Sequence, residues 1–395
     1  MPIQSLRGVR IAAFTQFLLG PAGVQLLADL GADVIKVEAV GTGAWERHWS
    51  GAATFSSGVS TFFMLANRNQ RSMTINLKSP DGLKAARRLV ASSDIVVENF
   101  RPGVMERLGL GYDAARELRA DIIYVSASGY GAEGPYRDLP GQDLLIQALS
   151  GVAAITGRAD EPPVPAGAAI IDQHGGALLA MAALAAVLHR DRTGEGQRVE
   201  VVMVDAAFNL YTEPVVYHLN GAALERPRSR VSDTFHEAPY GIYPTSDGAV
   251  AISVVKVADL RAALGGADVL VPFDDPALAF TRRDEICTIL AGILAPMATA
   301  DIVRRLRARN LWCAVVNDLD EAFADPAVRS LDPVLELEHP EAGTVRVLRH
   351  PARYGAGEPE LRRQPPRLGE HTSEVLAELG YSANEIEALG ESGAV

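Results

Sequence analysis

Residues 8–38 read GVRIAAFTQFLLGPAGVQLLADLGADVIKVE, in which three patterns follow one another. The apolar run from Val9 to Phe14 predicts a buried strand. The stretch from Gly20 to Gly31 has apolar residues at helical spacing and ends at a glycine, where helices often terminate. Residues Asp33 to Glu38 predict a second strand. A strand, a helix and a strand in succession form a βαβ unit, which predicts a parallel sheet.

The same alternation continues along the chain. A helix is predicted at residues 82–93, a strand at 94–99 and another at 121–128. A strongly apolar helix is predicted from Asp172 to about His189, with a strand at 198–204 after it. Parallel sheets collect ligand sites at the carboxyl ends of their strands. The first crossover has no GxGxxG, so the usual dinucleotide fingerprint is absent, but a nucleotide-containing ligand at the same edge is compatible with the pattern.

Composition excludes several classes of protein. At about 150 residues per domain, 395 residues predict two to three domains. The chain has 37 basic and 49 acidic residues, a net charge of -12, and no basic run, which argues against nucleic-acid binding. The longest apolar stretch, Ala177 to Leu188, is too short for a membrane span, and the N-terminus has no secretory signal pattern. We therefore expect a cytoplasmic globular protein with no membrane partner.

Several catalytic motifs are missing. The histidines show no HExxH spacing, and neither a GxSxG nor a GxxxxGK[ST] motif occurs. Cys287 and Cys313 have no zinc or redox spacing, so we expect them to be small buried apolar residues. We accordingly expect no metal site, no serine nucleophile elbow and no phosphate loop.

Aspartates next to small residues remain as candidates. Asp172 lies in GAAIIDQHGG and has two open interpretations: an N-cap of the following helix, or a carboxylate nucleophile beside backbone N–H groups that stabilise an oxyanion. Gly175 and Gly176 would leave room for a substrate. Gln142 and Asp143 precede another apolar helix, and Asp143 can equally be a helix-start residue.

Seven segments occur in an order that resembles the family III CoA-transferases of the CaiB/BaiF type, whose relatives include formyl-CoA transferase and carnitine CoA-transferase. They are residues 8–38, 67–82, 97–110, 139–151, 167–176, 193–206 and 368–380. The resemblance implies an α/β fold: a Rossmann-like large domain built from both chain ends, a smaller inserted α/β domain, and an interlocked homodimer. We expect the large domain at 1–205 and 363–395, the small domain at 239–325, and linkers at 206–238 and 326–362.

The same resemblance implies the transfer of CoA from an acyl-CoA donor, possibly succinyl-CoA, to a carboxylic acid, with CoA as substrate and no tightly bound cofactor. Asp172 would be the nucleophile that carries an aspartyl-CoA thioester. Gln142 and Asp143 would lie beside the reacting thioester, together with Gly175 and Gly176, and Trp49 near the acyl group. The expected CoA contacts are Gln16, Phe17, Leu18, Ile75, Asn76, Leu77, Lys78, Asn99, Phe100 and Arg107. Lys78 and Arg107 suit the CoA phosphates electrostatically.

Three departures from the family pattern affect the expected activity. Ala39 stands where many members have an arginine that meets CoA. The segment SDTFHEAPYG replaces the glycine-rich loop of formyl-CoA transferase, which argues against formyl and oxalyl substrates. Gln142 stands where α-methylacyl-CoA racemase has a histidine, and glutamine cannot exchange a proton. Intramolecular CoA transfer and a non-catalytic CoA-binding scaffold remain as alternatives.

Overall fold

The computed structural model describes residues 2–229 and 231–395, which form two compact units. The larger unit contains the residues up to 146 together with 168–210 and 333–395. The smaller unit contains residues 147–167 and 211–332. The larger unit is therefore built from three separate stretches of the chain.

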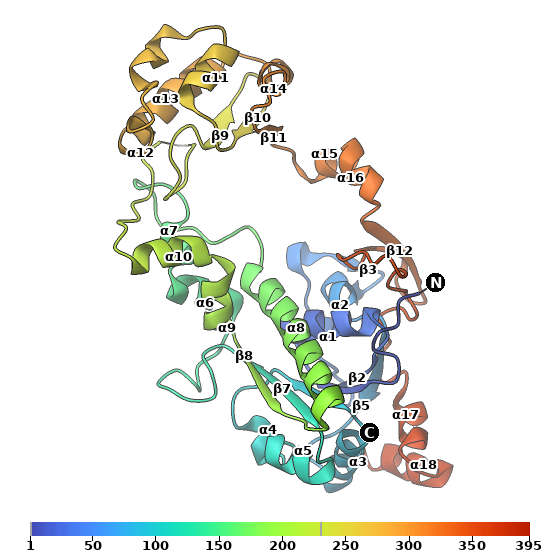
Figure 1. The fold of residues 1–395 in the computed structure, drawn as a ribbon. Helices are drawn as coiled ribbons and strands as arrows, with labels where there is room; N and C mark the ends of the chain where they lie inside the picture. The colour runs from blue at the N-terminus through green and yellow to red at the C-terminus, as the bar shows by residue number, and fades with distance from the viewer. Residues whose placement is uncertain (1, 230) are drawn as a thin grey trace. The chain divides into compact units, whose positions relative to one another are not determined.

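A six-stranded parallel sheet forms the centre of the larger unit (Figure 1). Its strands are β1 (Arg10–Phe14), β2 (Asp33–Glu38), β5 (Gln70–Thr74), β6 (Ile95–Glu98), β7 (Ile123–Ser128) and β8 (Arg198–Val202). The spatial order is β5-β2-β1-β6-β7-β8. Counted by their appearance in the chain, this is the doubly wound order 3-2-1-4-5-6, in which the direction of winding reverses between β1 and β6.

Helices pack on this sheet because its strands are apolar on both faces. Ala12 and Phe14 of β1 belong to a buried cluster with α3 (Pro80–Ala91), α5 (Tyr112–Leu118) and α17 (Thr372–Glu378). Two other helices, α1 (Leu19–Asp29) and α8 (Ile170–Thr193), pack against each other, and α8 also contacts β7 and β8. The parallel sheet predicted from the alternating pattern is confirmed.

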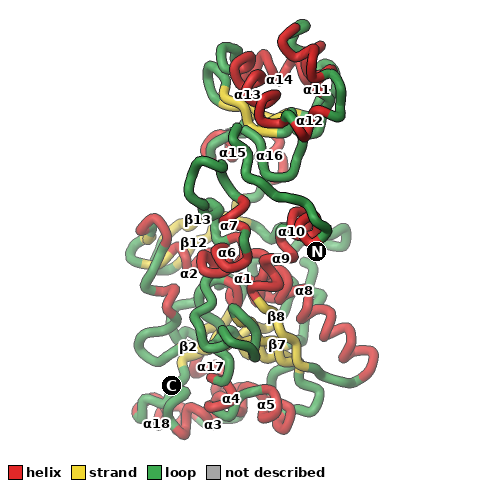
Figure 2. The backbone as a smooth tube through the Cα atoms, turned by 90° about the vertical axis from the view of Figure 1, so that its left-hand side faces the viewer, coloured by secondary structure: helices red, strands yellow, loops and turns green. Residues whose placement is uncertain are grey.

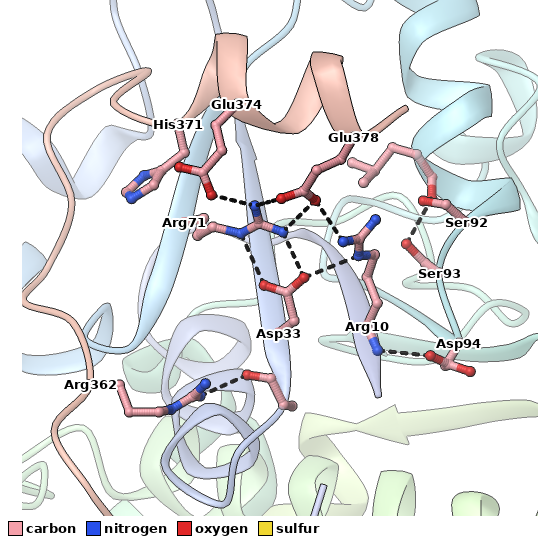
Figure 3. Close-up of polar contacts among 12 residues, drawn as sticks. Arg10, Asp33, Arg71, Ser92, Ser93, Asp94, Arg362, His371, Glu374 and Glu378 are labelled. Atoms are coloured by element: carbon pink, nitrogen blue, oxygen red, sulfur yellow. Dashed lines mark hydrogen bonds and ion pairs between the residues drawn. The ribbon is translucent and has the colours of Figure 1, made fainter. Parts of the chain in front are cut away.

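The C-terminal segment returns to the first strands through a network of charges (Figure 3). Arg71 of β5 is almost fully buried, and its guanidinium lies 2.6 Å from Asp33. The same guanidinium lies 2.9 Å from Glu374 and 2.7 Å from Glu378, both on α17. Residues that are about 300 positions apart in the sequence are thereby joined at one edge of the sheet.

The smaller unit contains a three-stranded antiparallel sheet with helices packed around it (Figure 2). The strands are β9 (Gly241–Pro244), β10 (Ala249–Ile252) and β11 (Cys313–Val315), and the helices include α11 (Val257–Ala263), α13 (Arg283–Leu294) and α14 (Thr299–Arg307). A turn that includes Asp247 and Gly248 joins β9 to β10. Cys287 is buried, as expected, whereas Cys313 is half-buried.

The segments expected to be linkers contain regular structure. Residues 206–238 include the end of α9 (Met203–Leu210) and all of α10 (Thr212–Leu219). Because α9 begins at Met203, β8 ends at Val202 rather than at the expected residue 204. Residues 326–362 include α16 (Pro326–Leu331), β12 (Val334–His339) and β13 (Gly343–Leu348). The return to the larger unit begins at 333 rather than 363, and residues 147–167 group with the smaller unit. Such short elements contain too few residues to display a clear period.

Among the described residues, α8 is the single helix long and apolar enough to cross a membrane on its own, by length and composition. The longest uninterrupted apolar stretch of the sequence, Ala177 to Leu188, is shorter than this helix. In the larger unit α8 packs on α1, α9, β7 and β8. These contacts are those of a core helix.

Candidate active site

The carboxyl edge of the parallel sheet brings several predicted site residues together. Gln16 follows β1, residues 75–78 follow β5, and Asn99 follows β6. Because β1 and β6 are neighbours, Gln16 and Asn99 meet where the winding direction reverses, the place at which doubly wound sheets bind ligands.

Asn99 holds the turn between β1 and α1. Its Oδ1 accepts a hydrogen bond from the main-chain N–H of Gln16 at 2.9 Å, and its Nδ2 donates to the Gln16 carbonyl at 2.8 Å. The Asn99 amide is thereby used within the protein. We conclude that the side chain of Asn99 positions Gln16, Phe17 and Leu18, the segment expected to contact CoA.

Asp172 lies in the first turn of α8, and its N-cap interpretation is wrong. The N-cap is Ala169, which offers no side-chain acceptor. The acceptor comes instead from Asp143, whose Oδ1 receives the main-chain N–H groups of Ile171 at 2.7 Å and of Asp172 at 3.0 Å. Asp143 is buried and is also the first residue of α6 (Asp143–Ser150). One carboxylate therefore fixes the backbone that carries Asp172.

The Asp172 carboxylate makes no hydrogen bond or ion pair with other residues in the described part of the chain. Burial raises the pKa of Asp172 to about 7, and the negative charge of Asp143 adds to this shift. A carboxylate that is poorly solvated and titrates near neutrality is reactive once it is ionised. These properties favour the nucleophile interpretation of Asp172.

Gly175 and Gly176 have a different role from the one expected. A Cβ on Gly175 would lie 2.6 Å from Cδ1 of Leu19, and one on Gly176 would lie 3.0 Å from the Leu19 carbonyl oxygen. The space above both glycines is thus filled by α1, not left for a substrate. The two glycines let α8 approach α1 closely, which brings the turn of Asp172 next to the segment of Gln16 to Leu18.

A second pair of glycines positions Gln142 and Asp143. A Cβ on Gly141 would lie only 2.4 Å from the Cα of Gly129, the residue that follows β7. The two backbones therefore touch at the carboxyl edge of the sheet. Gln142 is exposed next to the buried Asp143, so its amide is accessible to a substrate.

Replacing Gly141 by alanine is expected to lower turnover about tenfold or more while the protein stays folded. The new Cβ would push the segment away from Gly129, and a displacement of about 1 Å at reacting groups can cost on the order of 100-fold in rate. Turnover and circular dichroism would be measured together. Gly292→Ala is the control, because nothing lies within 4 Å of a Cβ there; equal activity of both variants would contradict the packing role of Gly141.

The remaining expected CoA contacts lie in different surroundings. Ile75 and Leu18 are buried, and Leu77 and Phe100 are packed against the core of the larger unit. Asn76 binds the C-terminal segment, with its N–H donating to the Ala394 carbonyl at 2.9 Å. Of the expected contacts, Phe17, Lys78 and Arg107 are exposed, and Gln16 is half-buried.

Arg137 is a cation that the sequence analysis missed. A Cβ on Gly103 would lie 3.1 Å from the guanidinium of Arg107 and 3.6 Å from that of Arg137, so the two guanidiniums are close together. The signal was weak, because Arg137 stands in the irregular segment between β7 and α6 and belongs to no motif. Two guanidiniums that converge in this way suit an anion such as a phosphate.

Trp49 lies in an exposed row of aromatic rings. The ring centroids are 4.8 Å apart for Phe17 and Trp45, 5.2 Å for Trp45 and Trp49, and 4.9 Å for Trp49 and Phe62. The Trp49 side chain is 44% exposed. Within the described residues, no hydrogen bond or ion pair joins Asp172 to Trp49, Lys78 or Arg107.

Comparisons with known proteins bear on this site. A sequence model of CoA-transferase family III matches residues 6–372. The chain is 36% identical to an acyl-CoA transferase of Fusarium pseudograminearum, over 99% of this chain and 88% of that protein. It is 31% identical to the succinate–glutarate CoA-transferase of Agrobacterium fabrum, over 95% of each. The structure is similar to that of a CAIB/BAIF family protein from Brucella suis, with a TM-score of 0.83 and 28% identity, over 95% of this chain and 99% of that one.

Proposed function

The chain belongs to CoA-transferase family III, and from that premise we propose that it transfers CoA between an acyl-CoA and a free carboxylic acid through covalent intermediates on Asp172. The observation that carries the proposal is the Asp172 carboxylate itself. It is partly buried, lacks a hydrogen-bond partner among the described residues, and lies next to the turn expected to bind CoA.

The reaction proceeds by exchange of acyl bonds. The Asp172 carboxylate attacks the donor thioester, which forms an acyl-aspartyl anhydride and releases CoA thiolate. The thiolate attacks the aspartyl carbonyl, which releases the donor acid and leaves an aspartyl-CoA thioester. The acceptor carboxylate then repeats these steps in reverse and regenerates Asp172. One thioester replaces another, so the exchange is nearly isoenergetic and no ATP is consumed.

The chain's own groups assist these steps. Asp143 fixes the main chain of Asp172, so the nucleophile meets the thioester in a constant orientation. The exposed Gln142 amide can donate a hydrogen bond to a developing oxyanion. Lys78, Arg107 and Arg137 supply the positive charge that the CoA phosphates need, although the chain carries a net charge of -12.

We propose a small dicarboxylate as one partner acid, because the relative from Agrobacterium fabrum is named for succinate and glutarate. The alternative is intramolecular transfer between two carboxyl groups of one diacid, which uses the same Asp172 chemistry. Labelled free acid distinguishes the two, since only intermolecular transfer carries label into the CoA ester. A racemase is disfavoured because Gln142 cannot exchange a proton.

The homodimer that the family resemblance implies also stays a proposal. Met181 and Leu188 on α8, and Leu144 on α6, have at least half of their surface exposed in the single chain. Exposed apolar residues gathered on helices are typical of surfaces that another protein covers. The mass in solution, measured by light scattering, tests this assembly.

The direct test of the function is a screen of succinyl-CoA and acetyl-CoA against a panel of carboxylic acids, with mass spectrometry of the CoA products. Borohydride or hydroxylamine added during turnover would then trap the aspartyl intermediate, and peptide mapping would locate it. An unmodified Asp172 peptide during active turnover would exclude the covalent route.

Activity is expected to increase with pH up to about 7 and to level off above it. The nucleophile must be ionised, and burial with the nearby Asp143 raises the pKa of Asp172 to about 7. Below that pH, kcat/KM should fall about tenfold per pH unit, because this parameter reports ionisations of the free enzyme. Initial rates at several subsaturating acyl-CoA concentrations measure the profile. A pH-independent kcat/KM on the acidic side would contradict this assignment.

A further inference from the structure

We propose that the buried ion pair between Lys36 and Glu46 is a positioning device that holds the turn at residues 15–18 in the conformation that binds CoA. The inference rests on the proposed function, since that function makes this turn a CoA contact. Neither residue belongs to the expected site. Lys36 lies in the middle of β2, and Glu46 lies in the short helix η1 (Trp45–Arg47).

The two charges are completely enclosed. Both side chains are 0% exposed, and Nζ of Lys36 lies 2.8 Å from Oε1 of Glu46. Each partner also contacts the turn. Nζ of Lys36 donates to the carbonyl oxygen of Thr15 at 2.9 Å, and Oε2 of Glu46 accepts the main-chain N–H of Phe17 at 3.0 Å.

Side chains alone satisfy both peptide groups of this turn. The peptide between Thr15 and Gln16 is bound by Lys36 at its oxygen and by Asn99 at its nitrogen. The peptide between Gln16 and Phe17 is bound by Asn99 at its oxygen and by Glu46 at its nitrogen. All four polar atoms thus have a partner, and the ion pair supplies two of the four.

The turn needs such support because its backbone is strained. Phe17 has a φ of 62°, in the left-handed region that residues with a Cβ rarely adopt. The hydrogen bonds to the main chain of Thr15, Gln16 and Phe17 keep it there. Without them, the segment is expected to relax toward an ordinary conformation and to change the position of the Gln16 and Phe17 side chains.

Stability alone does not explain a buried pair of this kind. Removing two charges from water is costly, and apolar residues of similar size often give a fold that is equally stable. What apolar residues cannot supply is a donor for the Thr15 carbonyl and an acceptor for the Phe17 N–H. The pair is therefore best explained by the orientation that it gives to the turn.

The helix η1 connects this turn with the exposed aromatic row. The Trp45 ring packs against both the Phe17 ring and the Trp49 ring. Arg47 fixes the other end of η1 through two bonds to Glu38, at 2.7 and 2.8 Å. Glu46 thus links the segment expected to hold CoA to the residue expected near the acyl group.

The test replaces both charges together, as Lys36→Met with Glu46→Leu, so that no unpaired charge is left buried. We expect the dissociation constant for CoA, measured by calorimetry, to increase about tenfold. KM for the acyl-CoA should increase by a similar factor and kcat should change less, while the melting temperature should fall because the Thr15 carbonyl and the Phe17 N–H lose their partners. A second variant, Glu46→Gln, keeps the volume but has a single acceptor oxygen for two donors, and should weaken CoA binding in the same direction.

A matched control is available in the same unit. Arg68 and Asp29 form an ion pair 2.6 Å apart, with side chains that are 5% and 3% exposed. The pair has no hydrogen bond to residues 15–18 within the described structure. Arg68→Met with Asp29→Leu should cost at least as much stability, because Asp29 also binds Asn69, yet leave the affinity for CoA unchanged.

Each outcome decides between the hypotheses. If the Lys36 and Glu46 double variant, or Glu46→Gln where the double variant does not fold, binds CoA with the parent's affinity, the positioning role is wrong. The same conclusion follows if the control variant loses as much affinity as they do. If the parent protein binds no CoA and transfers none, the proposed function itself fails.

Discussion

Asparagine in place of Asp172 is expected to abolish CoA transfer and to stabilise the folded protein at the same time. An amide of nearly the same shape cannot attack a thioester, so the covalent route is closed. Loss of a catalytic nucleophile typically lowers turnover by a factor on the order of 10⁴ or more. The Asp172→Asn variant should therefore give no CoA product above background.

The gain in stability follows from the sign of the pKa shift. Burial raises the pKa of Asp172 to about 7 in the folded state, whereas an unfolded aspartate titrates near 3.9. The folded state therefore favours the protonated carboxyl, and ionisation destabilises the fold progressively as the pH increases from about 4 to about 7. Asparagine does not ionise, so above pH 7 it should add up to about 4 kcal/mol to the free energy of unfolding.

Chemical denaturation at pH 8 and a transfer assay would measure both effects on one preparation. Asp205→Asn is the matched control, because Asp205 is the third residue of α9 as Asp172 is of α8, but it is exposed. The control should keep its activity and its stability. Turnover retained by Asp172→Asn would remove the nucleophile assignment, and a loss of stability at pH 8 would contradict the burial argument.

The sequence was sufficient to predict the parallel sheet and its carboxyl edge. The apolar runs at Val9–Phe14 and Asp33–Glu38 and the helix between them show clear periods, and local periodicity is what a single sequence records best. Gln16, Asn99 and the segment 75–78 were expected from the family resemblance to contact CoA, and the strand order places them at that edge.

The roles of individual side chains depended on contacts between distant residues. The residues around Asp172 are typical of a helix N-terminus, which suggested that Asp172 is the N-cap. The acceptor that caps the helix is instead Asp143, 29 positions away. Gly175 and Gly176 were interpreted as space for a substrate. The sequence near them does not indicate that α1 packs closely against these two glycines.

The position of Lys36 within a predicted buried strand could have indicated a buried ion pair from the sequence alone. A lysine in a strand that is buried on both faces needs a partner of opposite charge. Of the four lysines in the chain, Lys36 is fully buried, whereas only Lys78 was expected to have a role. The identity of its partner, Glu46, follows only from the folded structure.

Alanine in place of Asp143 is expected to lower kcat about 100-fold, whereas asparagine should cost far less. Alanine leaves the N–H groups of Ile171 and Asp172 without their acceptor, so the first turn of α8 loosens. Misplacement of a reacting group by about 1 Å can cost this factor in rate. Loss of the cap should also lower the free energy of unfolding by about 1 kcal/mol. Asparagine keeps an acceptor oxygen and is as good a cap as aspartate.

The two substitutions at Asp143 separate its geometric role from its charge. Asparagine removes the negative charge that helps to raise the pKa of Asp172, so the acidic limb of kcat/KM should move to lower pH. Alanine removes the same charge, so its acidic limb should also move to lower pH, and the lost acceptor should in addition lower kcat at every pH. The pH profiles of kcat and kcat/KM for both variants and for the parent separate the effect of geometry from the effect of charge. If asparagine lowers kcat as much as alanine does, the charge of Asp143 takes part in the reaction itself; an unmoved acidic limb would mean that burial alone sets the pKa of Asp172.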